Sequence, residues 1–265
     1  MIAVFQDLPA AGLKQANIAV MERAAHAAAA AGSRLIVFPE LFLTGYNIGR
    51  QALHELAEPV DGPSVGAIAG IARRHGIAII AGMPERSGDV VFNAALAVDE
   101  AGSVAGLYRK IHLFGPDERS AFAPGGEICA VRLAGRRVGL AICYDIEFPE
   151  MARALAGAGA DLICAPTANM SPYWEVPTTL LRARALENGI PVAYANLVGD
   201  DGRLTYTGMS CIVGADGRDL ARAGAQGRAL LCCSHGSAEV GPGRDPLSTQ
   251  AADVRLDILC SRTAG

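Results

Sequence analysis

Four polar residues each follow an apolar segment of the chain: Glu40, Lys110, Cys143 and Asn169. Strand ends converge on clefts in α/β proteins, so the sequence predicts that these side chains lie near one another. Cysteine attacks as its thiolate, and a nearby ammonium lowers the thiol pKa and stabilises an oxyanion. A carboxylate can accept the thiol proton, donate it to a leaving amine and later activate water. Glutamate, lysine and cysteine together therefore indicate nucleophilic catalysis with a leaving amine.

Cys143 follows the apolar run 138–142, which predicts a buried strand. A short polar turn comes next, and Pro149 suits the first position of a helix. Cys143 is therefore expected at a strand-to-helix corner, where its sulfur can face a cleft. The alternative is a buried core cysteine, because cysteine is among the most buried residue types. The flanking Tyr-Asp and Phe-Pro-Glu sequences favour the nucleophile.

Strands and helices must alternate to position these residues. Apolar runs predict strands over 2–5, 35–38, 77–83, 90–98, 104–108, 128–133, 137–142, 161–166, 191–196, 209–213, 219–223 and 228–233. Helices are predicted over 13–31, 64–75 and 177–188, and from Pro149 onwards. The segment 115–126, which carries Glu118, is predicted to be a polar loop. Alternating strands and helices with several hairpins predict an α/β domain with a mixed sheet.

The composition excludes several classes of protein. The 265 residues carry a formal net charge of -4 and show no basic patch, so no nucleic-acid partner is expected. No apolar run approaches the ~20 residues of a membrane span. The first six residues lack the basic region and long apolar region of a signal peptide. We therefore expect a cytoplasmic protein without a membrane partner.

The seven cysteines are scattered, with no C-x-x-C pair, and the sequence has no H-E-x-x-H motif. We therefore expect reduced thiols and no structural metal. Cys232 and Cys233 lie in an apolar run and are expected to pack within a strand.

Three motifs carry the residues that could react. Glu40 lies in Phe-Pro-Glu-Leu-Phe, Lys110 lies in Arg-Lys-Ile-His-Leu, and Cys143 begins Cys-Tyr-Asp-Ile-Glu-Phe-Pro-Glu. In sequence, order and spacing they resemble the signatures of the nitrilase superfamily, the carbon–nitrogen hydrolases. The resemblance covers residues 1–233. Glu118 stands where that family often has a second glutamate.

The resemblance implies a role for each of these residues. Cys143 would be the nucleophile, Glu40 the general base and acid, and Lys110 the oxyanion stabiliser, together with the backbone N–H of Tyr144. Glu118 would position the substrate or assist proton transfer; alternatively it lies exposed in a charged loop. No cofactor is implied.

Further residues are candidates for substrate binding. Tyr46, Asn169 and Trp174 could line the pocket, although Tyr46 could instead only pack a turn. Glu147 could face the cleft, where it would disfavour an anionic substrate, or it could point to solvent or pair with Arg153. Asp145 is expected to hold the corner by accepting backbone N–H bonds.

The resemblance also implies the fold and the assembly. It predicts a four-layer α-β-β-α sandwich with mixed sheets, formed as a single domain by residues 1–265, and a homodimer. The tail, residues 236–265, departs from the family pattern because a Gly-Pro-Gly sequence at 241–243 interrupts any helix there. In the family this tail often supports oligomer contacts, so it is expected at an oligomer interface.

The leading hypothesis is an amidase that converts a small carboxylic amide to an acid and ammonia through a thioester on Cys143. In this family Cys-Tyr-Asp is typical of amidases and Cys-Trp-Glu of nitrilases. A nitrilase or an N-carbamoyl amidohydrolase would use the same three residues. Two rival hypotheses are a thiol-dependent acyl-transferase and a non-catalytic binding protein of the same fold.

Overall fold

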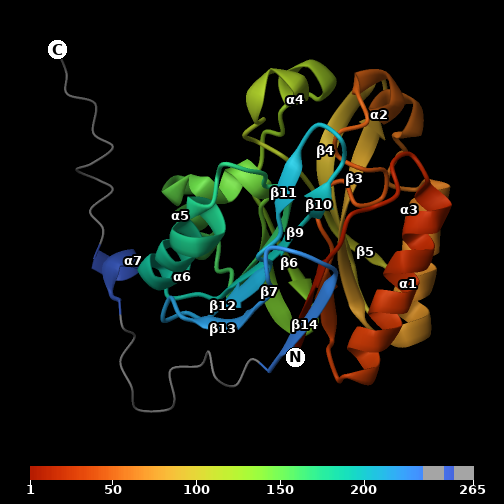
Figure 1. Ribbon diagram of the computed structural model, residues 1–265. Coiled ribbons are helices and arrows are strands. Elements are labelled where there is room, and N and C mark those ends of the chain that lie inside the picture. The colour runs from red at the N-terminus through yellow and green to blue at the C-terminus, as the bar shows by residue number, and fades with distance from the viewer. Residues whose placement is uncertain (235–247, 254–265) are drawn as a thin grey trace.

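The computed structural model describes residues 1–234 and 248–253. Two six-stranded sheets face each other between two layers of helices (Figure 1). The first sheet has the order β14-β1-β2-β3-β4-β5. Its strands are β1 (Ile2–Gln6), β2 (Leu35–Val37), β3 (Ala78–Ser87), β4 (Val90–Val98), β5 (Val104–Arg109) and β14 (Ala229–Cys233).

The second sheet has the order β13-β12-β9-β8-β7-β6. Its strands are β6 (Cys129–Leu133), β7 (Arg136–Leu140), β8 (Leu162–Thr167), β9 (Val192–Asn196), β12 (Cys211–Val213) and β13 (Asp219–Arg222). Strands β7, β8 and β9 are parallel, and the strands outside them pair antiparallel. The first sheet likewise combines parallel β1-β2-β3 with antiparallel partners. Both sheets are mixed, as the sequence predicted.

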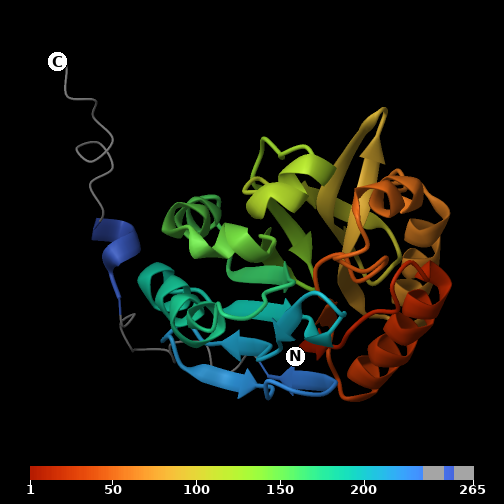
Figure 2. The same cartoon turned by 45° about the horizontal axis from the view of Figure 1, so that its top comes forward.

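Helices cover the outer faces of the two sheets. Helices α1 (Lys14–Ala30) and α3 (Pro63–His75) lie against the first sheet, and α5 (Pro149–Gly157) and α6 (Leu181–Asn188) lie against the second (Figures 1 and 2). The four-layer α-β-β-α sandwich is therefore confirmed.

Alternation along the strands explains the layers. In β1, Ile2 and Val4 belong to the core shared with the second sheet. Ala3 and Phe5 point the other way and pack in the core under α1 and α3. Because successive strand residues face opposite sides, one strand serves two cores.

Shorter elements complete the described chain. They are α2 (Arg50–Leu56), α4 (Gly115–Ala121), the 3-10 turn η1 (Cys143–Glu147), the π-helical turn η2 (Val176–Leu180), β10 (Val198–Asp200), β11 (Thr205–Thr207) and α7 (Gln250–Asp253). The prediction of a loop around Glu118 is wrong, because Glu118 lies in α4. Pro116 in the first turn and the acidic side chains of Asp117 and Glu118 near the helix N-terminus favour a helix there.

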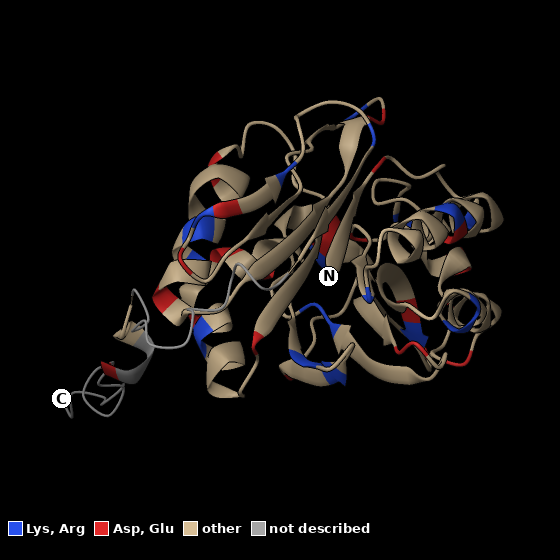
Figure 3. Ribbon diagram, turned by 90° about the horizontal axis from the view of Figure 1, so that it is seen from below, with Lys and Arg blue, Asp and Glu red and all other residues tan. Residues whose placement is uncertain are grey.

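Charged residues lie mainly on the helices and loops, and the strands are mostly uncharged (Figure 3). Among the described residues, no helix has the length and apolar character needed to cross a bilayer. The predicted interface tail, residues 236–265, lies outside the described residues apart from 248–253.

Gly82 in β3 lies against the backbone that carries Glu40. Its N–H donates to the carbonyl of Pro39 at 3.3 Å, and its own carbonyl accepts from Leu43 N at 3.1 Å. A Cβ at this position would lie 2.2 Å from Leu41 N and 2.6 Å from Pro39 O. Only glycine therefore allows the segment after β2 to cross β3 so closely.

Replacing Gly82 by Ala should displace Glu40 and lower the free energy of unfolding by about 1–3 kcal/mol. A displacement of about 1 Å should also lower kcat about 100-fold. Chemical denaturation and steady-state kinetics measure the two effects. Gly66→Ala in α3 is the matched control, because a Cβ there meets nothing within 4 Å. Equal stability and activity in the two variants would contradict this account.

Candidate active site

Strand ends bring the predicted residues together. Glu40 follows β2, and its N–H donates to the carbonyl of Thr167 at the end of β8 (3.3 Å). Lys110 follows β5, and its N–H donates to the carbonyl of Asn93 in β4 (2.8 Å). Cys143 opens η1 just after β7. Side chains from both sheets therefore meet at one end of the sandwich.

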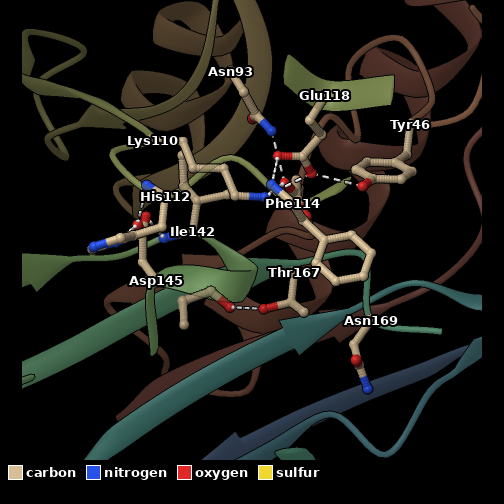
Figure 4. A network of polar contacts seen from close by, with 12 residues as sticks. Tyr46, Asn93, Lys110, His112, Phe114, Glu118, Ile142, Asp145, Thr167 and Asn169 are labelled. Atoms are coloured by element: carbon tan, nitrogen blue, oxygen red, sulfur yellow. Dashed lines mark hydrogen bonds and ion pairs between the residues drawn. The ribbon is translucent and has the colours of Figure 1, made fainter. Parts of the chain in front are cut away.

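The ammonium of Lys110 joins two carboxylates. Its Nζ donates to Glu40 Oε1 at 2.7 Å and to Glu118 Oε1 at 2.8 Å. Glu118 also accepts from the Tyr46 hydroxyl at 2.6 Å and from Phe114 N at 2.9 Å. Figure 4 shows the side chains of Lys110, Glu118 and Tyr46 pointing toward one another. Lys110 and Glu40 are completely buried, and Glu118 is 4% exposed.

Asn93 determines which oxygen of Glu40 is available. Its Nδ2 donates to Glu40 Oε1 at 2.7 Å, the same oxygen that accepts from Lys110. The other oxygen, Oε2, is buried and has no hydrogen-bond partner among the described residues. Glu40 is thus held by one oxygen, and the second can exchange a proton.

Burial and charge set the protonation of this pair. Burial raises the pKa of Glu40 to about 7, although Lys110 and Asn93 act in the opposite direction. Burial alone would lower the pKa of Lys110, but the charges of Glu118 and Glu40 outweigh it and hold that pKa well above its usual value. Lys110 is therefore a permanent cation, and Glu40 titrates near neutral pH.

Cys143 is held as a thiol. Burial raises its pKa well above the usual value, and the charge of Glu40 raises it further. Lys110 and a backbone hydrogen bond from Ala168 act in the opposite direction without overcoming this effect. A free thiolate is therefore disfavoured, and any attack by this sulfur would require a base that takes its proton in the same step.

Two residues at the site have left-handed backbones. Leu41, directly after Glu40, has φ 49°, and Cys143 itself has φ 48°. Such values are uncommon for residues with a Cβ, and strained backbones of this kind cluster at active sites. Two of the strand ends that carry the reactive groups therefore turn sharply.

Asp145 connects the segment around Lys110, at the end of β5, to the η1 turn that begins with Cys143. Its Oδ2 accepts from Ile142 N (3.0 Å) and from the Tyr108 hydroxyl (2.8 Å). Its Oδ1 accepts from His112 N (2.9 Å) and lies 2.8 Å from Nδ1 of the same histidine. Tyr108 and His112 flank Lys110, so one buried carboxylate fixes Lys110 relative to Cys143. It accepts backbone N–H bonds, as expected, and side-chain bonds in addition.

Arg184 in α6 supports the same turn from behind. It donates to the carbonyls of Ile146 (3.1 Å) and Glu147 (2.6 Å) and pairs with Glu187 at 3.1 Å. These hydrogen bonds link the outer helix α6 to η1. The residue is only 7% exposed, and Glu187 balances its charge.

A cavity of about 380 Å³ adjoins the carboxylate cluster. Tyr46 and Glu118 lie at its wall, together with Phe114, Met170 and Tyr173. Cys143 is not among the residues that line it, whereas Glu118, which accepts from Lys110, is. This volume lies within the ~300–1,000 Å³ of small-molecule sites.

The other predicted binding residues are dispersed. Tyr144 is half-buried and packs edge-on against Phe114 at 5.3 Å between ring centroids. Asn169 is buried and donates to Tyr173 O (2.9 Å) and Thr207 Oγ1 (3.0 Å), which gives it a structural position. Trp174 is 40% exposed and does not line the cavity.

Glu147 is half-buried, and burial raises the pKa of its carboxyl. It does not line the cavity. Arg153 donates instead to the carbonyl of Glu187 (2.9 Å), and no ion pair joins it to Glu147 within the described residues. The influence of Glu147 on substrate charge stays a prediction.

Sequence reasoning missed Asn93, Tyr108 and the N–H of Phe114. Asn93 is the single polar residue in the apolar run of β4, and that irregularity was the available signal. No sequence pattern indicated the hydrogen bond from the Phe114 N–H to Glu118, because that contact depends on how α4 folds. Among the described residues, no group of three or more His, Cys, Asp or Glu side chains could hold a metal ion.

Comparison with known proteins places this geometry in a family. Residues 1–235 match the family described as carbon-nitrogen hydrolase. The chain belongs to the carbon–nitrogen hydrolase family. A "Hydrolase in pqqF 5'region" of Pseudomonas protegens is 50% identical over 72% of this chain and 67% of that protein. An "(R)-stereoselective amidase" of a Pseudomonas species is 41% identical over 75% and 72%.

A solved relative supports the assignment of this carbon–nitrogen hydrolase. A double mutant of the amidase of Nesterenkonia sp. AN1, in complex with acrylamide, is 32% identical, with a TM-score of 0.84 over 98% of this chain and 95% of that one. Another structure of it shows Michael addition of acrylamide at its active-site cysteine. The neighbours therefore combine the same fold with a reactive cysteine, and this chain is a carbon–nitrogen hydrolase.

The activity should rise with pH as Glu40 ionises. On the acid side of the pH profile, kcat/KM should rise with pH and reach half its maximum near pH 7, the pKa of Glu40 in the free enzyme; this rise is the acid limb. Asn93→Ala removes a donor to the carboxylate and should move the limb upward by roughly half to one pH unit. A pH series of kcat/KM for each protein measures the limb.

Asn188→Ala is the control for Asn93→Ala, since this buried amide donates to Arg184 O in α6. It should leave the limb in place. A limb that moves to lower pH in Asn93→Ala would refute the assignment of Glu40.

Proposed function

We propose that this protein is an amidase that hydrolyses a primary carboxylic amide to the acid and ammonia. The observation that carries the proposal is the buried ammonium of Lys110 between Glu40 and Glu118, beside a protonated Cys143. One oxygen of Glu40 has no partner among the described residues and is available for proton transfer.

The first half of the reaction forms a thioester. The Cys143 sulfur attacks the amide carbon while its proton moves to Glu40, and the carbonyl oxygen becomes an oxyanion. Lys110 stabilises this oxygen, with the N–H of Tyr144 as the family resemblance suggests. Glu40 then gives the proton to the nitrogen, the C–N bond breaks and ammonia leaves.

The second half restores the enzyme. Glu40 takes a proton from water, the hydroxide attacks the thioester carbon, and the C–S bond breaks to release the acid. The proton returns to the sulfur. Glu118, which Lys110, Tyr46 and Phe114 N hold in place, would position the substrate or the water.

A nitrilase is the second candidate, because a protein of Pyrococcus abyssi named "Nitrilase" is 39% identical over 74% of both chains. The Cys-Tyr-Asp sequence favours the amide. An amide reaches its tetrahedral intermediate in one attack and then mainly needs a protonated leaving group. We therefore propose that amides react faster than the corresponding nitriles.

Ammonia release from matched amide and nitrile pairs tests this proposal. Wild-type protein should hydrolyse the amide with the higher kcat/KM, and Cys143→Ala and Glu40→Gln should each lose at least about 1,000-fold in kcat. Cys129→Ala is the control, because this cysteine is a half-buried residue at the start of β6 and lies outside the Lys110 cluster.

Folding of each variant is checked by circular dichroism. A folded Cys143→Ala that retains wild-type turnover would overturn the mechanism. Faster hydrolysis of the nitrile would overturn the preference for amides.

The family resemblance also supports a homodimer. Light scattering at micromolar concentration should give twice the 27.4 kDa chain mass. A monomer at that concentration would reject the dimer and leave the catalytic proposal untouched.

A further inference from the structure

The cavity beside Glu118 is built from four separated segments. They are the start of α2 with the loop before it, helix α4, the loop 170–173, and the turn between β10 and β11. These elements gather at one end of the sandwich (Figure 1). The lining of the cavity is continuous with the Lys110 cluster, because Tyr46 and Glu118 belong to both.

Most of the wall is apolar. Aromatic rings come from Tyr46, Phe114 and Tyr173, and Phe114 packs edge-on against Tyr173 at 5.7 Å between centroids. Leu53 and Met170 are buried and contribute aliphatic surface. Such a surface favours an apolar group, since each contact removes apolar area from water.

The charged side chains that line the cavity are either held by hydrogen bonds or exposed to solvent. Glu118 is bound by Lys110, Tyr46 and Phe114 N. Asp117 and Arg203 also line the cavity, but both are exposed and pair with each other at 3.7 Å. Arg50 is exposed on α2. Within the described part of the chain, the inner wall therefore offers no buried cation that could hold a second carboxylate.

We propose that this cavity binds the acyl side chain of the substrate and selects primary amides with a large apolar acyl group. Long alkyl and arylalkyl amides would be preferred over short amides and over amides that carry a second carboxylate. The inference rests on the amidase proposed above, because for a primary amide everything except the leaving nitrogen is the acyl side.

Burial gives the expected size of the preference. Each methylene that leaves water contributes about fourfold to transition-state binding. A carboxylate in the same position would lose its hydration without gaining a partner, which is costly. Hexanamide should therefore be a far better substrate than its near-isostere, the monoamide of glutaric acid.

The first experiment measures kcat/KM by ammonia release for acetamide, butanamide, hexanamide, 3-phenylpropanamide and glutaric acid monoamide. The value should rise about fourfold per added methylene along the alkyl series. It should be at least about tenfold higher for hexanamide than for the acidic amide. A flat series, or a preference for the acidic amide, would overturn the inference while leaving the amidase proposal standing.

The second experiment fills the cavity. Ser120 is an exposed residue of α4 that lines the cavity, and Arg119 is its exposed neighbour that does not. Ser120→Trp should lower kcat/KM for 3-phenylpropanamide at least about tenfold relative to acetamide, whereas Arg119→Trp should leave this ratio unchanged.

The outcomes separate the two proposals. An equal loss for both amides in Ser120→Trp would show that the acyl group lies elsewhere. If wild-type protein releases ammonia from no amide of any size, the amidase proposal fails and this inference fails with it.

Discussion

Lys110 is completely buried, and its ammonium is stable there because Glu40 and Glu118 each accept a hydrogen bond from it within 2.8 Å. Removing one partner of a buried ion pair typically costs about 3–5 kcal/mol, since the other charge is left unpaired. The three groups therefore depend on one another. Burial and the charge of Glu40 also keep Cys143 protonated, so in the proposed mechanism its proton passes to Glu40 during the attack.

The rest of the structure holds this arrangement in place. Glycine at position 82 lets the Glu40 segment lie directly on β3, and Asn93 fixes one oxygen of Glu40. Asp145 accepts hydrogen bonds from Tyr108 and His112, which lie two residues before and after Lys110. It also accepts from the N–H of Ile142, which precedes Cys143. The Asp145 contacts link the end of the first sheet to the turn that follows β7 in the second. A rigid frame of this kind reduces the reorganisation needed when charge develops in the transition state.

Strand and helix periodicity predicted most of the sheets and the strand-end positions of Glu40, Lys110 and Cys143. Local patterns could not predict what depends on contacts distant in sequence, such as the hydrogen bond from Asn93 to Glu40 or from Tyr108 to Asp145. The polar composition around Glu118 suggested a loop, but burial of Ala121 and Phe122 stabilises a helix. Trp174 was a candidate for the pocket, and Glu147 was a candidate for either the cleft or solvent; neither lines the cavity.

The most direct test of the account is the mass of the protein during turnover. Glu118→Ala, mixed with an amide and quenched in acid, should gain the mass of the acyl group, and peptide mapping should place this adduct on Cys143. Cys143→Ala should gain nothing under the same conditions. An adduct on a residue other than Cys143 would contradict the thioester mechanism, whereas wild-type turnover by Glu118→Ala without an adduct would show that Glu118 is not needed for deacylation.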